Sequence, residues 1–359
     1  MNNVFYSVAA LLLIASCAPA QVEGPIRWTK ITLTNQFYSE GANFGDFNHD
    51  GKMDITSGPF WYEGPDFSPE KQHEFMPVQS HKPDDDYSND FLTFVYDFNG
   101  DGWDDILVIG FHGEDASWYE NPKGKEGHWV RHKIFDHVDN ESPGFGDLLK
   151  EGKPVLICST EGRLGYARPD WSDPAKRWTW HPISEKKDYQ RFTHGLGWGD
   201  VNGDGRNDLL TAQGWYEQPT SLQADPAWTF HPADFGPGGA QMYVCDVNGA
   251  GRPDVITSLE AHGYGLAWFE QKPDGTFDAH LIVGRTPQDN PQGVVITEMH
   301  AIDVIDINGD GLPDIVTGKR HFAHGSHGPD PDSLAPSVLY WFELKRDNGK
   351  AHYVAHLID

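Results

Sequence analysis

The chain has 359 residues, of which 38% are hydrophobic and 13% aromatic, and it carries 54 acidic against 27 basic side chains. A formal net charge of −27 excludes the basic face that nucleic acids and anionic membranes require, so we expect neither as a partner. The 39 glycines and 25 prolines, with this aromatic content, indicate a folded, turn-rich β protein and not a disordered acidic chain.

The N-terminus is typical of an export signal. Residues 8–16 form an apolar run that is too short for a permanent transmembrane helix. Ala18 and Ala20 offer a signal-peptidase site, whereas residues 14–17 resemble a lipoprotein box that would lipidate Cys17. We expect a signal peptide over residues 1–20, one domain over 25–359, and no membrane span. The mature protein is then periplasmic, secreted or lipid-anchored at the cell envelope.

A nine-residue phrase recurs along the rest of the chain. Its copies occupy residues 46–54, 97–105, 200–208, 246–254 and 306–314, and a degenerate copy begins at Asp147. The starts are 46 to 60 residues apart, which is the spacing of propeller blades. The repeat also contains an aromatic strand, such as residues 118–120, and an alternating strand, such as residues 128–134. These patterns predict an all-β fold, a β-propeller with four-stranded blades.

The number of blades is open between six and seven. The outer-strand patterns number seven, including those at residues 27–33 and 351–358, whereas the inner strands number six. Residues 27–33 are predicted to be an outer strand, either a spare one or part of a seventh blade. Cys158 and Cys245 lie in apolar, strand-like runs, so we expect two buried thiols and no disulfide framework.

The repeated phrase has the composition of a calcium loop. Oxygen-bearing side chains stand at positions 1, 3, 5 and 9, and glycine stands at position 6, where a sharp turn is needed. We expect structural Ca²⁺ in these loops, with a metal-free turn as the alternative for the copies at Asp147 and Asp246. The expected ligands are Asp46, Asn48, Asp50, Asp54, Asp97, Asn99, Asp101, Asp105, Asp200, Asn202, Asp204, Asp208, Asp246, Asn248, Asp254, Asp306, Asn308, Asp310 and Asp314.

Polar residues that differ from blade to blade predict where chemistry occurs. If the Asp-rich loop joins the first two strands of every blade on one face, the loops before the first strand and after the second surround the channel on the opposite face. We expect acids, bases and cations to converge at this mouth. The candidates are Glu141, His194, His262, Glu298, His300, Lys319 and Arg320. A group of two histidines and a glutamate there is alternatively a site for a catalytic divalent metal such as zinc.

Residues 45–51 and their copies resemble the FG-GAP/VCBS repeat propellers. Residues 40–42, 58–65, 300–301, 317–320 and 339–342 are similar to the propeller domain of the aldos-2-ulose dehydratases and their bacterial relatives. This resemblance covers the propeller only, without the cupin domains of the fungal enzymes.

The resemblance implies a carbon–oxygen lyase or dehydratase that performs β-elimination on a keto sugar. His300 or His194 would be the base, Lys319, Arg320 or a metal would stabilise the enolate, and His262 or Glu141 would be the acid. Two alternatives stay open: a polysaccharide lyase whose Arg320 neutralises a uronate, and a non-catalytic propeller that binds glycans or proteins.

Overall fold

The computed structural model describes residues 26–84, 86–290, 292–321, 323–347 and 350–359. The predicted signal peptide and Cys17 lie outside the described residues. Apart from the 3₁₀ turns η1 (Pro69–Lys71) and η2 (Pro287–Asp289), the regular structure in these ranges is β. No helix within them has the length and apolar character needed to cross a membrane.

The described strands form antiparallel sheets in chain order, four sheets of four strands and one of eight. The first two sheets are β1 (Ala42–Gly45), β2 (Asp54–Ser57), β3 (Phe60–Tyr62) and β4 (Gln72–Glu74), then β5 (Leu92–Tyr96), β6 (Asp105–Ile109), β7 (Glu114–Glu120) and β8 (Val130–Val138). The third is β9 (Gly144–Gly146), β10 (Val155–Thr160), β11 (Arg163–Arg168) and β12 (Thr179–Pro182).

The eight-stranded sheet combines two further units. These are β13 (Leu196–Gly199), β14 (Asp208–Thr211), β15 (Gly214–Glu217) and β16 (Thr229–Pro232), with β17 (Gln241–Cys245), β18 (Asp254–Ser258), β19 (Leu266–Gln271) and β20 (Phe277–Val283). The innermost strands β13 and β17 join them by parallel pairing. The last sheet is β21 (Ile302–Ile305), β22 (Asp314–Lys319), β23 (Val338–Asp347) and β24 (Lys350–Leu357).

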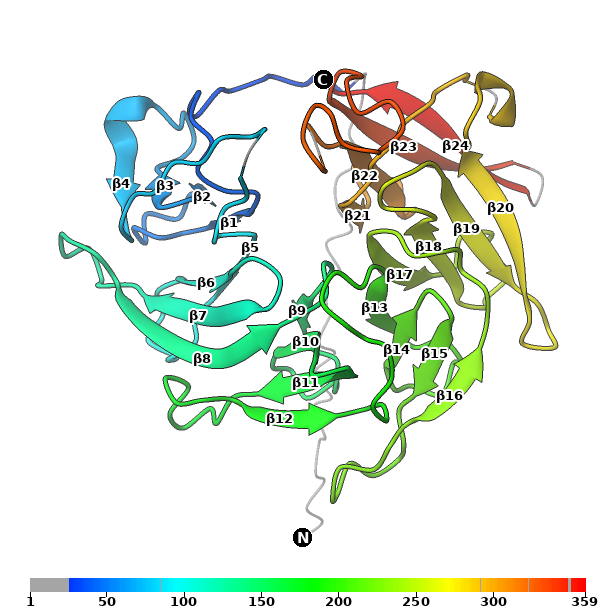
Figure 1. Ribbon diagram of the computed structural model, residues 1–359, viewed down its shortest axis with the longest axis horizontal. Helices are drawn as coiled ribbons and strands as arrows, with labels where there is room; N and C mark the ends of the chain where they lie inside the picture. The colour runs from blue at the N-terminus through cyan, green and yellow to red at the C-terminus, as the bar shows by residue number, and fades with distance from the viewer. Residues whose placement is uncertain (1–25, 85, 291, 322, 348–349) are drawn as a thin grey trace, which may run out of the picture.

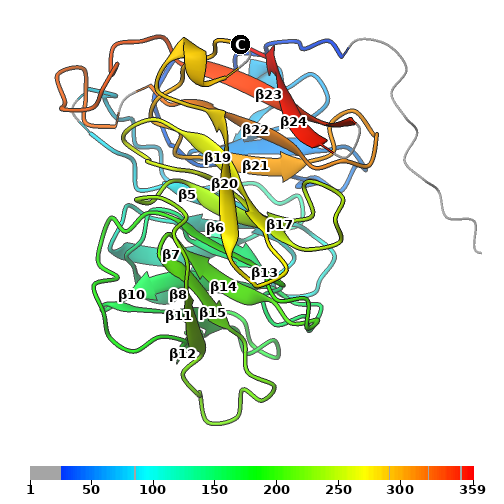
Figure 2. The ribbon, with the colours of Figure 1, turned by 90° about the vertical axis from the view of Figure 1, so that its right-hand side faces the viewer.

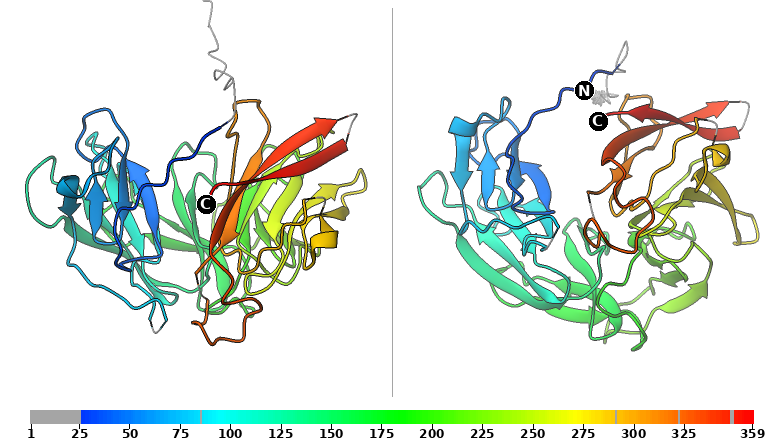
Figure 3. Two further views of the ribbon diagram at one scale, coloured as in Figure 1. Left: turned by 90° about the horizontal axis from the view of Figure 1, so that it is seen from above. Right: turned by 45° about the horizontal axis from the view of Figure 1, so that its top comes forward.

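The units are arranged around a common centre as in a propeller, which confirms the predicted all-β propeller-like architecture (Figure 1). Each unit runs from an inner strand to an outer one, and β20 lies on the outer surface when the ring is seen from its side (Figure 2). The first described segment passes beside the C-terminal strand (Figure 3), and Lys30 Nζ lies 2.5 Å from an oxygen of Asp359.

The prediction of an outer strand at residues 27–33 is wrong, because these residues have no strand structure. Trp28 and Ile31 remain 44% and 47% exposed, so the alternating side chains have no face to cover. In the described chain no strand pairs with this segment, and an alternating pattern without a hydrogen-bonded neighbour does not form a stable strand.

Apolar side chains pack between neighbouring sheets. Every residue of β6 and β10 is buried, and Leu107 and Leu156 belong to one core cluster with Trp118. Cys158 is fully buried and Cys245 partly, and both are free thiols. The core therefore fixes each unit against the next and does not depend on a disulfide within the described residues.

The aspartate at position 9 of the phrase ties three strands together. Asp208 is completely buried, and its two oxygens accept the backbone N–H of Val201 at 3.0 Å and of Gln218 at 2.9 Å. The same pair of bonds is made by Asp54, Asp105, Asp254 and Asp314. Two backbone N–H groups are thereby satisfied in each of these five units, which gives this aspartate a structural role without any metal.

The other conserved features of the phrase shape the loop itself. Asp46 accepts the N–H groups of Asp50 and Gly51, which closes the turn. Gly51 has φ of 83°, a left-handed conformation that disfavours residues with a Cβ. The degenerate copy keeps this arrangement, since Asp147 accepts the N–H groups of Glu151 and Gly152.

A histidine on each outer strand lies against an aromatic ring of the third strand. The pairs are Trp61–His73, Trp118–His132, Tyr166–His181, Trp215–His231, Trp268–His280 and Trp341–His356, with centroids 4.0 to 4.9 Å apart. In five of them the imidazole also bonds a glutamate of the third strand, as His280 does with Glu270 at 2.9 Å. These histidines have a repeated structural role.

Candidate functional site

Four side chains from separate units converge on the mouth opposite the Asp-rich loops. Glu141 precedes β9, His194 precedes β13, His262 follows β18 and His300 precedes β21. One nitrogen or oxygen from each lies within 4.8 Å of those of the other three. The three imidazole rings have centroids 4.7 to 5.6 Å apart. The structure thus brings together four of the seven predicted mouth residues, hereafter the His–Glu cluster.

A hydrogen bond to the neighbouring backbone orients His300 toward the cluster. Its Nδ1–H donates to the carbonyl oxygen of Glu298 at 3.2 Å, which leaves the Nε2 lone pair free. This Nε2 is buried without a hydrogen-bond partner among the described residues, 4.0 Å from Glu141 Oε2. Burial, followed by the charge of Arg320, lowers the pKa of His300 to about 2. His300 is therefore a neutral imidazole at pH 7, the form that binds metals.

Glu141 supplies the negative charge of the cluster. Its Oε2 lies 3.0 Å from Nε2 of His194 and 3.9 Å from Nε2 of the buried His112. Burial by itself raises the pKa of this carboxyl, but the contact with His194 and the neighbouring imidazoles lower it to about 2. Burial lowers the pKa of His262 and takes that of His112 to about 4. The cluster hence combines an ionised carboxylate with the neutral imidazole of His300.

A second group shares His262 with the cluster. His324 and Asp330 belong to the loop between β22 and β23, and His324 Nδ1 lies 2.8 Å from Asp330 Oδ2. The His324 ring is stacked on His262 at 4.6 Å and its side chain is 48% exposed. An exposed imidazole oriented by a buried carboxylate is the usual arrangement of a general base. Sequence analysis missed Asp330, which has no repeated counterpart to mark it.

Lys319 and Glu298 occupy a different environment from the one expected. Lys319 Nζ is buried and donates to Glu298 Oε2 at 2.6 Å. It also donates to the backbone oxygens of Arg320, His321 and Ser333, at 3.0, 3.3 and 3.2 Å. Lys319 therefore anchors both ends of the loop that carries His324 and Asp330, and it does not face the mouth.

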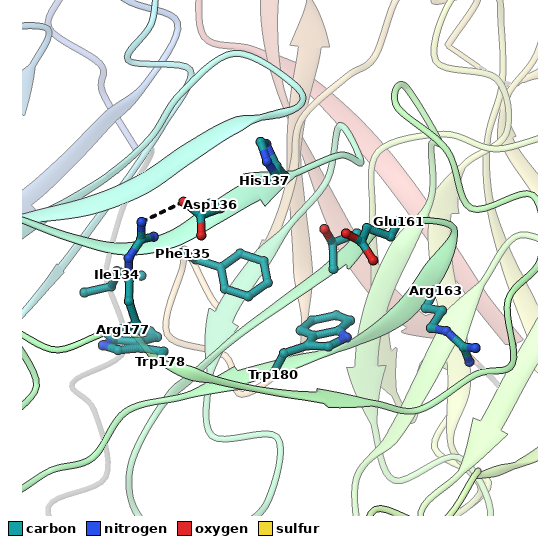
Figure 4. Close-up of a pocket in the computed structure, with 10 residues that line it drawn as sticks. Ile134, Phe135, Asp136, His137, Glu161, Arg163, Arg177, Trp178 and Trp180 are labelled. Atoms are coloured by element: carbon teal, nitrogen blue, oxygen red, sulfur yellow. Dashed lines mark hydrogen bonds and ion pairs between the residues drawn. The ribbon is translucent and has the colours of Figure 1, made fainter.

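A pocket of about 400 Å³ lies away from the His–Glu cluster, where β8 meets the third sheet (Figure 4). Phe135 and Trp180 line it with centroids 5.4 Å apart, and Asp136 on its rim is paired with Arg177 at 2.6 Å. None of its lining residues belongs to the cluster. This pocket and the His–Glu cluster are therefore separate features of the structure.

The His–Glu cluster has the donor set of a zinc site. Three imidazole nitrogens and one carboxylate oxygen, from loops that flank the strands, match the ligands and number that Zn²⁺ prefers. The buried Nε2 atom of His300, which lacks a hydrogen-bond partner among the described residues, fits a bound cation. Oxygen-only ligands would favour Ca²⁺ or Mg²⁺ instead.

Comparison with known proteins supports the fold and the repeat. Residues 246–317 match the model of the FG-GAP-like repeat. A lectin from Agrocybe aegerita, known for recognising non-reducing terminal N-acetylglucosamine, aligns over 88% of this chain and 79% of its own at 16% identity, with a TM-score of 0.51. The structural neighbours also include a rhamnogalacturonan lyase from Bacillus licheniformis, at 12% identity over 93% of this chain and 67% of its own, with a TM-score of 0.39. No curated protein matches the sequence.

Proposed function

We propose that this protein is a metal-dependent carbon–oxygen lyase that performs β-elimination on an oxidised carbohydrate. The observation that carries the proposal is the meeting of the His–Glu cluster with the His324–Asp330 pair at one mouth. A metal-binding set beside an oriented imidazole provides the two functions that elimination next to a carbonyl requires.

The groups divide the reaction between them. A divalent ion held by Glu141, His194, His262 and His300 would polarise the carbonyl oxygen and stabilise the enolate. His324 takes the proton from the carbon next to the carbonyl, and Asp330 stabilises the imidazolium that results. The bond between the β-carbon and its oxygen substituent then breaks, a carbon–carbon double bond forms, and the leaving oxygen takes up a proton. No oxidant or reductant is consumed.

This assignment changes the roles expected from the sequence. His194, His262, Glu141 and His300 act as ligands and His324 acts as the base. Arg320 stays at the mouth, where its charge influences His300. The substrate class rests on the resemblance to the dehydratases and on this chemistry.

The Asp-rich loops are proposed as separate, structural Ca²⁺ sites. Their side-chain oxygens lie opposite the mouth, with the same loop geometry in each complete copy. We propose further that residues 25–359 are one propeller domain of an exported protein, with the described sheets as six blades.

The test is ultraviolet absorbance of the Zn²⁺-loaded, calcium-saturated protein incubated with methyl 3-keto-β-D-glucoside, with 1,5-anhydrofructose and with uronic acid glycosides. We expect a new absorbance from the unsaturated product. His324→Gln should retain zinc and lower the initial rate roughly 100-fold or more, since general bases contribute about that factor. His280→Gln, which alters a repeated Trp–His pair, is the matched control and should leave the rate unchanged.

A folded, zinc-loaded protein that forms no unsaturated product from any of these sugars would exclude the lyase function. Equal rates for the wild type and His324→Gln would exclude the assignment of the base while leaving the reaction itself standing.

A further inference from the structure

Two guanidinium groups at the mouth are held by aromatic rings. The Arg320 guanidinium lies 6.0 Å from the ring centroid of Tyr87, and Tyr87 is stacked on Phe111 at 5.0 Å. The Arg191 guanidinium lies 5.4 Å from Phe111 and 5.1 Å from Phe192. A guanidinium packed on a ring keeps its N–H edges available for hydrogen bonds, so this Arg–aromatic group presents donors as well as charge.

The Arg–aromatic group is contiguous with the His–Glu cluster. Phe111 lies 5.0 Å from the ring of His112, whose Nε2 is 3.9 Å from Glu141. Arg191 and Phe192 precede His194 in the same loop, which is bonded to the segment of Glu141 through Phe192 N–H to Asp139 oxygen and Glu141 N–H to Thr193 oxygen. Arg320 directly follows Lys319, whose anchoring fixes its position. Both arginines therefore belong to the mouth.

The two arginines differ in their partners from arginines elsewhere in the described chain. Some of those, such as Arg163, Arg252 and Arg346, donate to backbone oxygens, and others are paired with carboxylates. Arg131, Arg168 and Arg177 lie 2.6 to 2.7 Å from carboxylates of the chain. No carboxylate of the described chain comes within 4.0 Å of Arg191 or Arg320, although acidic residues are twice as numerous as basic ones. Two guanidinium groups without an ion-paired carboxylate, next to the His–Glu cluster, form a local site for an anion, although the charge of Arg320 also acts on Glu40.

The backbone at Phe192 supports a binding role for this loop. Phe192 has φ of 68°, a conformation that is unfavourable for a residue with a bulky side chain, and its ring is 46% exposed. Such strain commonly persists where a side chain is held for function. An exposed aromatic ring beside a cation offers an apolar surface for the C–H face of a sugar.

We infer that the substrate is an acidic carbohydrate, whose carboxylates are bound by the N–H edges of Arg191 and Arg320 while its ring packs on Phe192. This inference rests on the proposed function and specifies its substrate class. The carboxylate then supplies the carbonyl group that acidifies the neighbouring C–H. Neutralisation by a guanidinium favours loss of that proton to His324, because the charge that develops on the carboxylate oxygens is offset.

Binding can be measured without turnover, by calorimetry on the full-length, Zn²⁺-loaded protein. The probes are methyl glycosides of glucuronic, galacturonic and mannuronic acid, each paired with its neutral methyl ester. We expect at least one acid to bind 10-fold or more tightly than its ester, with an affinity that falls as NaCl is raised from 0.05 to 0.5 M. Arg191→Gln and Arg320→Gln should each remove most of this preference.

Arg131→Gln is the matched control, because it removes one positive charge from an ion pair on β8 and should leave binding unchanged. Arg191→Lys retains the charge and should retain part of the preference, which separates loss of recognition from loss of folding. Equal binding of every acid and its ester, or a preference unchanged in both Gln variants, would overturn the inference. Preferential binding of an acid without any unsaturated product would overturn the lyase function and leave standing only the recognition of an acidic sugar by the two arginines.

Discussion

The two faces of this protein use the same residue types in opposite ways. On the loop face and along the outer strands, aspartates and histidines repeat from unit to unit and make the same bonds each time, as Asp208 and His280 do. At the mouth, Glu141, His194 and His300 occupy equivalent positions before the inner strands β9, β13 and β21, yet each has its own contacts. Repetition therefore marks stability and departure from the repeat marks the site.

Removing one histidine from each region is the sharpest test of this comparison. His194→Ala should weaken zinc binding by roughly 100-fold or more, since even loss of a group that only orients a metal ligand costs about 10- to 100-fold. His231→Ala, which removes the partner of Trp215, should leave zinc affinity unchanged. Competition with a fluorescent zinc chelator measures both, and equal affinities in the two variants would contradict the division between the faces.

Asp208→Ala should produce the largest loss of folding stability on the repeated side. It leaves two buried backbone N–H groups without acceptors, at about 1–3 kcal/mol each. Asp204→Ala in the same loop removes an exposed carboxylate and should cost less than about 1 kcal/mol in calcium-free buffer. Urea unfolding in EDTA gives both values. If the two variants lost similar free energies of unfolding in EDTA, the backbone hydrogen bonds of Asp208 would contribute no more to stability than an exposed carboxylate does.

On the mouth side, the free energy of unfolding is expected to depend on pH. The reason is Asp90, a buried carboxyl that lies just before β5. Burial raises its pKa to about 8, Thr93 donates to one oxygen at 2.9 Å, and the other oxygen has no partner among the described residues. Between about pH 4 and pH 8, the folded chain thus keeps a proton on Asp90 that the unfolded chain has already lost. This group should lower the free energy of unfolding by roughly 1.4 kcal/mol for each pH unit in that window.

Asp90→Asn should remove that pH dependence, since the amide keeps an acceptor for Thr93 and does not titrate. Unfolding by urea at several pH values between 5 and 8 compares the variant with the wild type, and the exposed Asp84→Asn serves as the control. Parallel curves for Asp90→Asn and the wild type would show that Asp90 is ionised in the folded protein.

His280→Ala should have the smallest effect, about 1 kcal/mol, because it removes one ring contact with Trp268 and a partly exposed bond to Glu270. His352→Ala, whose side chain is similarly exposed, is the control and should lie within about 0.5 kcal/mol of the wild type. Thermal unfolding followed by tryptophan fluorescence distinguishes them, and a neutral His280→Ala would deny the Trp–His pairs a stabilising role.

The repeat made much of the fold predictable. Residues 118–120 and 128–134, expected as strands from their aromatic and alternating patterns, fall largely in β7 and β8. The same logic gave the mouth positions of Glu141, His194, His262 and His300, because a repeated topology fixes which loops share a face. Residues 27–33 failed because pairing depends on a neighbouring edge that local alternation does not encode.

The directions in which the side chains of the site point could not be predicted from the sequence. Lys319 is the last residue of β22, at the position expected of a mouth residue, but its ammonium turns to Glu298 and the backbone of the following loop. Asp330 and Arg191 lie in irregular segments without a repeated counterpart. Arg191 and Phe192 did carry one usable signal, since they stand in the loop that also supplies His194.

The anchoring of the loop by Lys319 has a consequence for how such a protein changes over time. Because one buried ammonium holds the backbone at residues 320, 321 and 333, the loop is closed at its base whatever its tip contains. Doubling the length of a flexible loop costs only about 0.6 kcal/mol in closure entropy. The stretch bearing His324 and Asp330 can thus change in sequence and in length during evolution while the propeller beneath it keeps its structure.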